Sequence, residues 1–229
     1  MDTLETVRNL VGQGRFSQAL ETLPNITVAY RDRFSAEVLR AELLEKSGQH
    51  DASRAILLRL GRTRGLSQRD RSACEFISSF IARDAGDVEA ARLHLQRAVS
   101  FAVAAPDLEL TSLAQLRLAS IIADQSGPEA ISPLFAEARG NAIKLGNPHV
   151  TAALHLVVGE LDAKRGFLTS AVRHTRLAQE LVASTSNLWL DAWAENNLLA
   201  LCLVRSEFEQ AALHGDRVLE LSLLRRICG

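Results

Sequence analysis

The sequence predicts an all-α solenoid of about six antiparallel helix pairs, and three observations support this prediction. Ala, Leu, Glu and Arg, which lose little side-chain freedom in a helix, dominate a chain of 229 residues with only 5% aromatic residues. No segment shows the sustained apolar–polar alternation of β-branched residues that predicts a strand. Short turn-like clusters recur near residues 14, 48, 86, 127, 166 and 206, at spacings of 34 to 41 residues.

Helical segments are expected on both sides of each turn. Their predicted bounds are 2–12, 16–23, 30–46, 51–61, 67–84, 87–104, 107–124, 128–145, 148–165, 168–184, 187–205 and 207–225. A Gly after a helix allows the left-handed conformation in which the chain reverses. A small residue five positions later lets the two helices approach closely, and four units carry one there: Ala19, Ala91, Ala171 and Ala211. One pair cannot bury its apolar side alone, whereas stacked pairs build a continuous core.

Capping residues and prolines predict several helix ends. Ser67 followed by Asp70 resembles a capping box, and Asn147 is a favourable cap for the helix that follows it. Proline is tolerated at the first helical position, and three prolines stand where helices are expected to begin: Pro106, Pro128 and Pro148. Pro133 falls within the first two turns of the 128–145 helix, so the start of that helix is expected to shift or bend.

In this phase the residues resemble the tetratricopeptide repeat family, which has a small residue midway along the first helix, Gly at the turn and Ala in the second helix. The fifth unit matches best, at Gly159, Gly166, Leu168, Ala171 and Ala178. The third unit matches at Gly86, Val88, Ala91, Leu95 and Ala98. The first and sixth match from the turn onward, whereas the second and fourth are degenerate because Ala52 and Ala130 come early. The resemblance implies a right-handed superhelix whose concave surface is lined by the first helix of each pair.

Motifs for catalysis, cofactors or metals are missing from the sequence. It has no P-loop, no dinucleotide fingerprint and no HExxH motif. No two of the six histidines are three or four residues apart, and the closest, His149 and His155, lie on opposite helical faces. Glu42 and Glu45 have the spacing of a solvated helical face. We therefore expect a protein that is not an enzyme, with no cofactor and no metal.

Charge and cysteine content narrow the partners and the compartment. Lys and Arg number 26 against 27 Asp and Glu, which argues against a nucleic-acid partner. The arginine-rich stretch from Arg59 to Arg71 predicts a solvated loop, with a basic patch for acidic protein or phosphate as the alternative. No apolar run approaches the roughly 20 residues that span a bilayer, and the first ten residues lack a secretory h-region. Three widely spaced cysteines, Cys74, Cys202 and Cys228, fit a reducing compartment. We expect a cytoplasmic protein with no membrane partner.

Partner-binding residues are predicted from the positions that face the groove in the resembled family. These positions are Phe76, Phe80, Arg83, Arg117, Glu160, Lys164, Trp193 and Asn196. Trp and Arg are enriched at binding hot spots, and Asn can hydrogen-bond an extended peptide backbone. Trp189, Trp193 and Asn197 are four residues apart and share one helical stripe. The alternative is that both tryptophans pack between the helices at 187–205 and 168–184.

The leading functional prediction is a non-catalytic scaffold that holds a protein or peptide in the concave groove. The alternative is the sensory or regulatory domain of a larger bacterial signalling or transcription-regulator protein. The last predicted helix carries an apolar run, Val218 to Leu224, with no solvating helix after it. We expect residues 1–229 to form one repeat domain at the N-terminal part of a longer protein. Otherwise another molecule covers this helix, and self-association is one such case.

Overall fold

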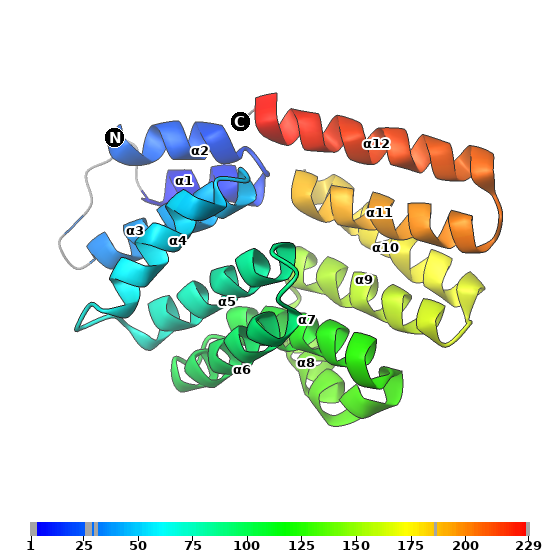
Figure 1. Ribbon diagram of the computed structural model, residues 1–229, viewed down its shortest axis with the longest axis horizontal. Helices are drawn as coiled ribbons and strands as arrows, with labels where there is room; N and C mark the ends of the chain where they lie inside the picture. Colours follow the sequence, from blue (N-terminus) through cyan, green and yellow to red (C-terminus); the bar gives the residue numbers. More distant parts are fainter. Residues whose placement is uncertain (1–3, 26–28, 30–31, 186, 228–229) are drawn as a thin grey trace.

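The computed structural model describes residues 4–25, 29, 32–185 and 187–227. Within these ranges the chain forms helices and no strand. The α-helices are α1 (Leu4–Gly12), α2 (Phe16–Thr22), α3 (Arg33–Lys46), α4 (His50–Gly61), α5 (Gln68–Asp84), α6 (Val88–Ala104), α7 (Leu108–Ser126), α8 (Ser132–Leu145), α9 (Pro148–Lys164), α10 (Leu168–Thr185), α11 (Leu188–Val204) and α12 (Phe208–Ile227). Consecutive helices pair antiparallel and the pairs stack along a curved path (Figure 1). The predicted all-α solenoid of helix pairs is confirmed.

Two predicted caps are confirmed by their hydrogen bonds. The Ser67 hydroxyl accepts a bond from the Asp70 amide at 3.0 Å, which satisfies one free N–H group at the start of α5. The Asn147 side chain accepts from the His149 amide at 2.9 Å, and Pro148 is the first residue of α9. The short-range sequence signals therefore place these helix starts correctly.

Two expected helix starts are wrong. Helix α7 does not begin at Pro106, because Asp107 caps it by accepting from the Leu110 amide at 3.0 Å. Pro128 begins a short 3-10 turn, η3 (Pro128–Ile131), and α8 begins only at Ser132. Pro133 lies at the start of α8, where its missing N–H breaks no helical bond, so the shifted start that it predicted is found.

The turns inside the pairs share one geometry in five of the six units. Each has a residue with positive φ, between 59° and 82°: Gly14, Gly48, Gly86, Gly166 and Ser206. The amide of the following residue bonds to a carbonyl five residues earlier, for example Asp87 to Ala82 at 2.9 Å. This closes the helix end and reverses the chain. The fourth unit differs, because η3 follows Gly127.

Small residues let the helices of a pair pack closely. The four predicted alanines, Ala19, Ala91, Ala171 and Ala211, are all at most 3% exposed. Ser53 and Ile131 are buried in the two degenerate units, whereas Ala52 and Ala130 are exposed. The Ser53 hydroxyl donates to the Ala41 carbonyl at 2.7 Å, which satisfies its polar atom inside the pair. The two degenerate units therefore use other residues at the contact.

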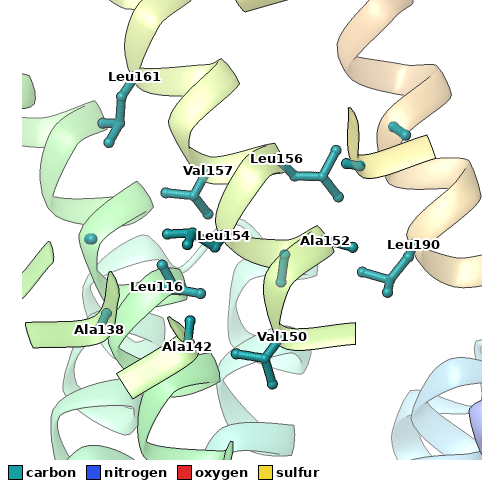
Figure 2. Packing of buried hydrophobic residues seen from close by; sticks show 14 of the residues in the cluster. Leu116, Ala138, Ala142, Val150, Ala152, Leu154, Leu156, Val157, Leu161 and Leu190 are labelled. Atoms are coloured by element: carbon teal, nitrogen blue, oxygen red, sulfur yellow. The ribbon is translucent and has the colours of Figure 1, made fainter. Parts of the chain in front are cut away.

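The largest core cluster joins α7, α8, α9, α10 and α11. Val150, Leu156 and Val157 of α9 are fully buried in it, close to Leu116 of α7 and Leu190 of α11 (Figure 2). Because α9 is buried on several sides, it is the central helix of this half of the solenoid. The core fixes α7, α9 and α11 relative to one another, and these helices carry most of the site described below.

The solenoid curls until its first unit contacts α11 (Figure 1). A Cβ atom at Gly14 would lie 2.8 Å from the Leu188 backbone nitrogen, so the first turn packs directly on the start of α11. Trp189 packs against the cluster of Val7, Phe16 and Leu43 in the first two units. This contact joins units that are far apart in sequence and encloses the inner face of the solenoid.

Candidate functional site

A cavity of about 590 Å³ lies on the inner face of the solenoid and is here named the inner cavity. Its wall comes mainly from α5, α7, α9 and α11, the first helices of the third to sixth units, with Leu95, Val218 and Ser222 added from second helices. Seven of the eight predicted partner-binding residues line it: Phe80, Arg83, Arg117, Glu160, Lys164, Trp193 and Asn196. The structure thus brings together residues that lie up to 116 positions apart in sequence.

The eighth predicted residue, Phe76, lies outside the inner cavity and one helical turn before Phe80. Their ring centroids are 5.0 Å apart, edge to face. Phe76 lines two neighbouring hollows instead, a second cavity of about 390 Å³ and a central cavity of about 260 Å³. The second cavity faces α1, α3, α5 and α7.

A row of aromatic rings crosses the inner face from α5 to α11. Phe80 meets Trp189 edge to face at 5.9 Å between ring centroids, and Trp189 meets Trp193 at 5.4 Å. Both tryptophans line the inner cavity and are half-buried. They also contact the core of α7 to α11 from this side. The two tryptophans are therefore not buried between α10 and α11, which was the alternative prediction. Trp189 was expected on the same stripe but not among the eight binding residues.

Arg117 lies against this aromatic row. Its guanidinium carbon is 4.5 Å from the Trp193 ring centroid and 5.1 Å from that of Phe80, distances at which a cation is attracted to a ring face. Arg117 forms no hydrogen bond or ion pair with any residue that the structure describes. Burial lowers the pKa of Arg117 to about 10, with the nearby Arg83 charge adding to the effect. The side chain still carries its charge at neutral pH.

The other charged groups of the inner cavity have partners. Glu160 accepts hydrogen bonds from the Ser120 hydroxyl and from the Trp193 indole N–H, both at 2.7 Å. Lys164 pairs with Asp124, and Arg83 lies 3.2 Å from Asp84. Among the three cations that line the cavity, Arg117 is the one without a carboxylate partner in the described part of the chain.

Two asparagines of α11 add polar atoms to the same wall. Asn196 is exposed, so its amide is free to meet an incoming group. The Asn197 side-chain nitrogen is buried and finds no acceptor among the described residues. An unsatisfied buried donor costs free energy, so it favours a ligand or water that supplies the missing acceptor.

Polar contacts that sequence reasoning missed lie between the two helices of single units. His94 and Glu75 are 2.6 Å apart, as are His214 and Glu195, and the ring nitrogens of His155 and His174 are 2.9 Å apart. Each pair is separated by 19 residues. The available signal was that residues 75, 155 and 195 stand at multiples of the 40-residue repeat, which aligns these units. Ser120 of α7 and Glu160 of α9 are also 40 residues apart, so they occupy equivalent positions in neighbouring units, and they are hydrogen-bonded to each other.

The remaining sequence candidates lie away from the inner cavity. Arg59 pairs with Glu37, and Arg69 bonds to Asp107 at 2.7 Å, so part of the arginine-rich stretch is used in contacts inside the chain. Burial raises the pKa of the Cys74 thiol to about 12. Glu45 is half-buried rather than freely solvated, and burial raises its pKa. Cys228 lies outside the described residues.

Metal-binding and membrane-spanning features are missing from the part of the chain that the structure describes. It contains no group of three or more His, Cys, Asp or Glu side chains placed to hold a metal ion. None of its helices has the length and apolarity needed to cross a lipid bilayer.

Comparison with known proteins characterises the chain by its fold. No model of a known protein family matches it, and no curated protein has significant sequence similarity to it. Among solved structures, the chain is similar to the crystal structure of BtubC (BKLC) from P. vanneervenii, with a TM-score of 0.54. That likeness covers 96% of this chain and 91% of the other at 16% sequence identity. At this identity it shows a shared helical fold.

Proposed function

We propose that the chain is a non-catalytic binding module of the tetratricopeptide repeat type that holds a peptide or protein segment in its inner cavity. The observation that carries the proposal is the combination of a 590 Å³ hollow with half-buried tryptophans and an arginine, Arg117, that has no carboxylate partner among the described residues. Ligand sites are typically concave and combine apolar contact area with polar groups that fix the ligand, and the inner cavity is lined by both kinds of residue. Trp and Arg are also the residues that dominate binding energy at protein interfaces.

The wall of the cavity suits an elongated polar ligand with apolar side chains. Phe80, Ile121 and Trp193 offer apolar contact, while Asn196 offers both a donor and an acceptor to a peptide backbone. These side chains project from helices that the core already holds in place. Binding therefore requires little ordering of the protein, which lowers its entropic cost.

A sensory or regulatory domain is the second candidate, and the closure of the solenoid favours it. Gly14 packs on Leu188, and the Lys46 ammonium lies 4.9 Å from the Trp189 ring centroid. A ligand in the inner cavity would touch Trp189 and so reach the contact that holds the first unit to α11. Ligand binding that changes this contact would change the curvature of the whole solenoid.

The test uses a random hexapeptide library, selected on the immobilised full chain. The only two tryptophans of the chain, Trp189 and Trp193, both line the cavity, so peptide binding there is expected to shift intrinsic tryptophan emission. Trp193→Ala is expected to weaken binding of the selected peptides at least tenfold. Phe167→Ala, which removes an aromatic residue that is 61% exposed and lies away from the cavity, serves as the matched control.

Peptides that bind Trp193→Ala as well as the parent chain, or that leave tryptophan emission unchanged, would show that the inner cavity is not the site. The second candidate adds one measurement. Small-angle scattering of the chain with and without a selected peptide is expected to show a change in radius of gyration if binding alters the closure. An unchanged radius would argue against that candidate alone.

A further inference from the structure

The central cavity lies where the closure of the solenoid brings its first and last units together. Its volume is about 260 Å³, and the first helices of all six units contribute to its wall. Phe16 of the first unit and Trp189 of the sixth both line it, and Trp189 packs against the core cluster that contains Phe16. The wall of this hollow is therefore complete only while the first unit packs on α11.

Aromatic rings make up a large part of this wall. Five of the eleven Phe, Trp and Tyr residues of the chain line the central cavity: Phe16, Phe76, Phe80, Trp189 and Trp193. Aliphatic side chains from α1, α7 and α11 add to the apolar lining: Val11, Leu113, Leu116 and Leu190. Rings favour contact with other rings, and apolar cavities bind apolar molecules. The lining thus favours a ligand with a flat aromatic body.

Most charged side chains at the central cavity already have partners within the protein. Glu42 and Lys46 form an ion pair at 3.7 Å. Glu109 accepts a hydrogen bond from the Asn147 side chain at 3.2 Å. Arg8 is exposed, so water hydrates its charge. None of these groups depends on an ionic ligand to compensate its charge.

Arg117 and His149 complete the polar part of the wall. The carboxylates of Glu160, Asp84 and Glu45 surround Arg117 with charges opposite to its own. Burial lowers the pKa of His149, so its ring is uncharged at neutral pH. The central cavity therefore combines aromatic contact area with charges that are compensated from inside the chain or by water.

From these observations we infer that the central cavity is a second binding site, which takes an uncharged molecule with an aromatic body of about two fused rings. Benzene fits an apolar cavity of about 150 Å³, so a hollow of about 260 Å³ has room for a second ring. A charged ligand would lose hydration without finding a free counter-charge in the wall. The ligand would contact the first unit and α11 together, so its binding also favours the closed solenoid. This inference does not depend on the peptide site proposed for the inner cavity.

Three compounds with the same ring system test the selectivity for an uncharged ligand. Indole is the neutral probe, indole-3-acetate carries a negative group and tryptamine carries a positive one. Isothermal titration calorimetry on the full chain measures all three, because indole emission overlaps that of the two tryptophans. Indole is expected to bind about tenfold tighter than either charged analogue, since their charges would be desolvated without compensation.

Gly12→Leu tests where indole binds. Gly12 is the last residue of α1 and lines the central cavity, and a Cβ atom there meets nothing within 4 Å. The leucine side chain is expected to weaken indole binding about tenfold, because it fills space that the ligand needs. Gly61→Leu is the matched control, since Gly61 is the last residue of α4, lies outside this cavity and has the same free space at its Cβ. It is expected to keep the affinity within about twofold.

Gly14→Ala tests the link between this site and the closure. Gly14 does not line the central cavity, but a Cβ atom there would meet Leu188, whereas a Cβ atom at Gly48 meets nothing within 4 Å. Gly14→Ala is expected to bind indole about threefold more weakly than Gly48→Ala, because part of the binding energy must then restore the closed state. Equal affinities would overturn the link to the closure.

The second site itself is overturned if indole does not bind the parent chain, or if a charged analogue binds as tightly as indole. Unchanged indole binding in folded Gly12→Leu would also overturn it, since the ligand would then lie elsewhere. The comparison of the three probes on the parent chain stands even if a variant does not fold. Failure of the peptide selection would contradict the proposed function and leave the result for indole unaffected.

Discussion

The seams between paired helices and the inner face of the solenoid are built from opposite kinds of residue. In the seams, small residues such as Ala91 and Ala171 are fully buried, and a Cβ at Gly159 would meet the Thr175 hydroxyl oxygen at 2.9 Å. On the inner face, large side chains such as Arg117 and Trp193 remain half-buried around a hollow of about 590 Å³. The seams are closely packed, whereas the inner face keeps a hollow and, at Arg117, a cation with no directly bonded carboxylate among the described residues.

The contrast separates the residues that stabilise the fold from those available for binding. Close packing in the seams stabilises each pair through dispersion contacts and apolar burial. Burial of a charge without a directly bonded carboxylate, as at Arg117, costs free energy in the free protein, and the contacts with the Trp193 and Phe80 rings offset only part of that cost. Natural proteins accept such local costs where a ligand later relieves them. The four predictions that follow test this division of roles.

Trp189 is the exception on the inner face, because it both lines the cavity and holds the first unit. Trp189→Ala is expected to lower the free energy of unfolding by about 3 kcal/mol, since it empties a contact with the cluster of Val7 and Phe16. Urea unfolding followed by circular dichroism measures the change. Trp193→Ala, which lacks that contact, is expected to cost clearly less. Equal losses would mean that Trp189 does not anchor the closure.

Gly159→Ala tests the close packing of the seam between α9 and α10. The added Cβ would lie 2.9 Å from the Thr175 hydroxyl and 3.2 Å from the Ala171 carbonyl oxygen, so the helices must separate. We expect a loss of about 2 kcal/mol in thermal or urea unfolding. Gly140→Ala on α8 is the matched control, because its Cβ meets nothing within 4 Å. It is expected to stabilise by about 0.5–1 kcal/mol, and similar behaviour of both variants would contradict the packing argument.

Gly14 and Gly48 isolate the contact that closes the solenoid. Both have nearly the same left-handed φ, +73° and +76°, so a substitution by Ala causes the same backbone strain of about 1 kcal/mol at each. Only at Gly14 would the new Cβ meet Leu188, at 2.8 Å from its nitrogen. Gly14→Ala is therefore expected to destabilise by about 1 kcal/mol more than Gly48→Ala. It is also expected to enlarge the radius of gyration in small-angle scattering. Identical effects would show that the closure adds nothing.

The smallest expected effect is a pH dependence from the α9–α10 seam. Burial lowers the pKa of both His155 and His174. The charge of His174 lowers the pKa of His155 further. Asp162 opposes the lowering at His174, while Arg173 and Arg139 add to it. The unfolded chain then binds more protons, so this part of the stability is complete above pH 6.5 and is lost as the pH falls.

Unfolding free energies between about pH 7.5 and pH 5, a range that brackets the ordinary histidine pKa, measure this dependence. His174→Gln is expected to flatten the decline towards low pH, because it removes one of the two groups that must stay neutral. Gly140→Ala serves as the control, because it leaves both histidines in place. Its unfolding free energy is expected to decline towards low pH as steeply as that of the parent chain. A steeper decline in His174→Gln would reverse the sign of the argument.

Much of the fold could be predicted from local signals. Ser67 and Asn147 cap the helices that they were expected to cap, because capping depends on residues only two or three positions away. The helix start expected at Pro106 was wrong, because the next residue, Asp107, is the one that caps α7. In the two degenerate units the buried residues are Ser53, which stands five positions after Gly48 as the repeat pattern requires, and Ile131, which stands one position before the expected one. Local patterns predict helices better than they predict which face packs.

The candidate site was predictable in its members and not in their arrangement. Seven of the eight predicted residues share the inner cavity because first helices of stacked pairs face one side, a consequence of the repeat alone. Phe76, the eighth, lines the second and central cavities instead. The contact between Phe80 and Trp189 had no signal in the sequence, since it depends on the curvature that several units accumulate. The contact between His155 and His174 was missed because the two residues lie on different helices, α9 and α10, on either side of a turn.

Short-range interactions are enough to specify a series of helix pairs with a turn near every fortieth residue, because glycine conformations and apolar periodicity act over a few residues. They also assign the aromatic and cationic side chains to particular first helices. The closure of the first unit against α11, the contact of Phe80 with Trp189 and the lack of a carboxylate partner for Arg117 in the described chain emerge only from the packed solenoid. Those outcomes depend on small rotations between neighbouring pairs, which add up over the solenoid and are set by packing rather than by local preference.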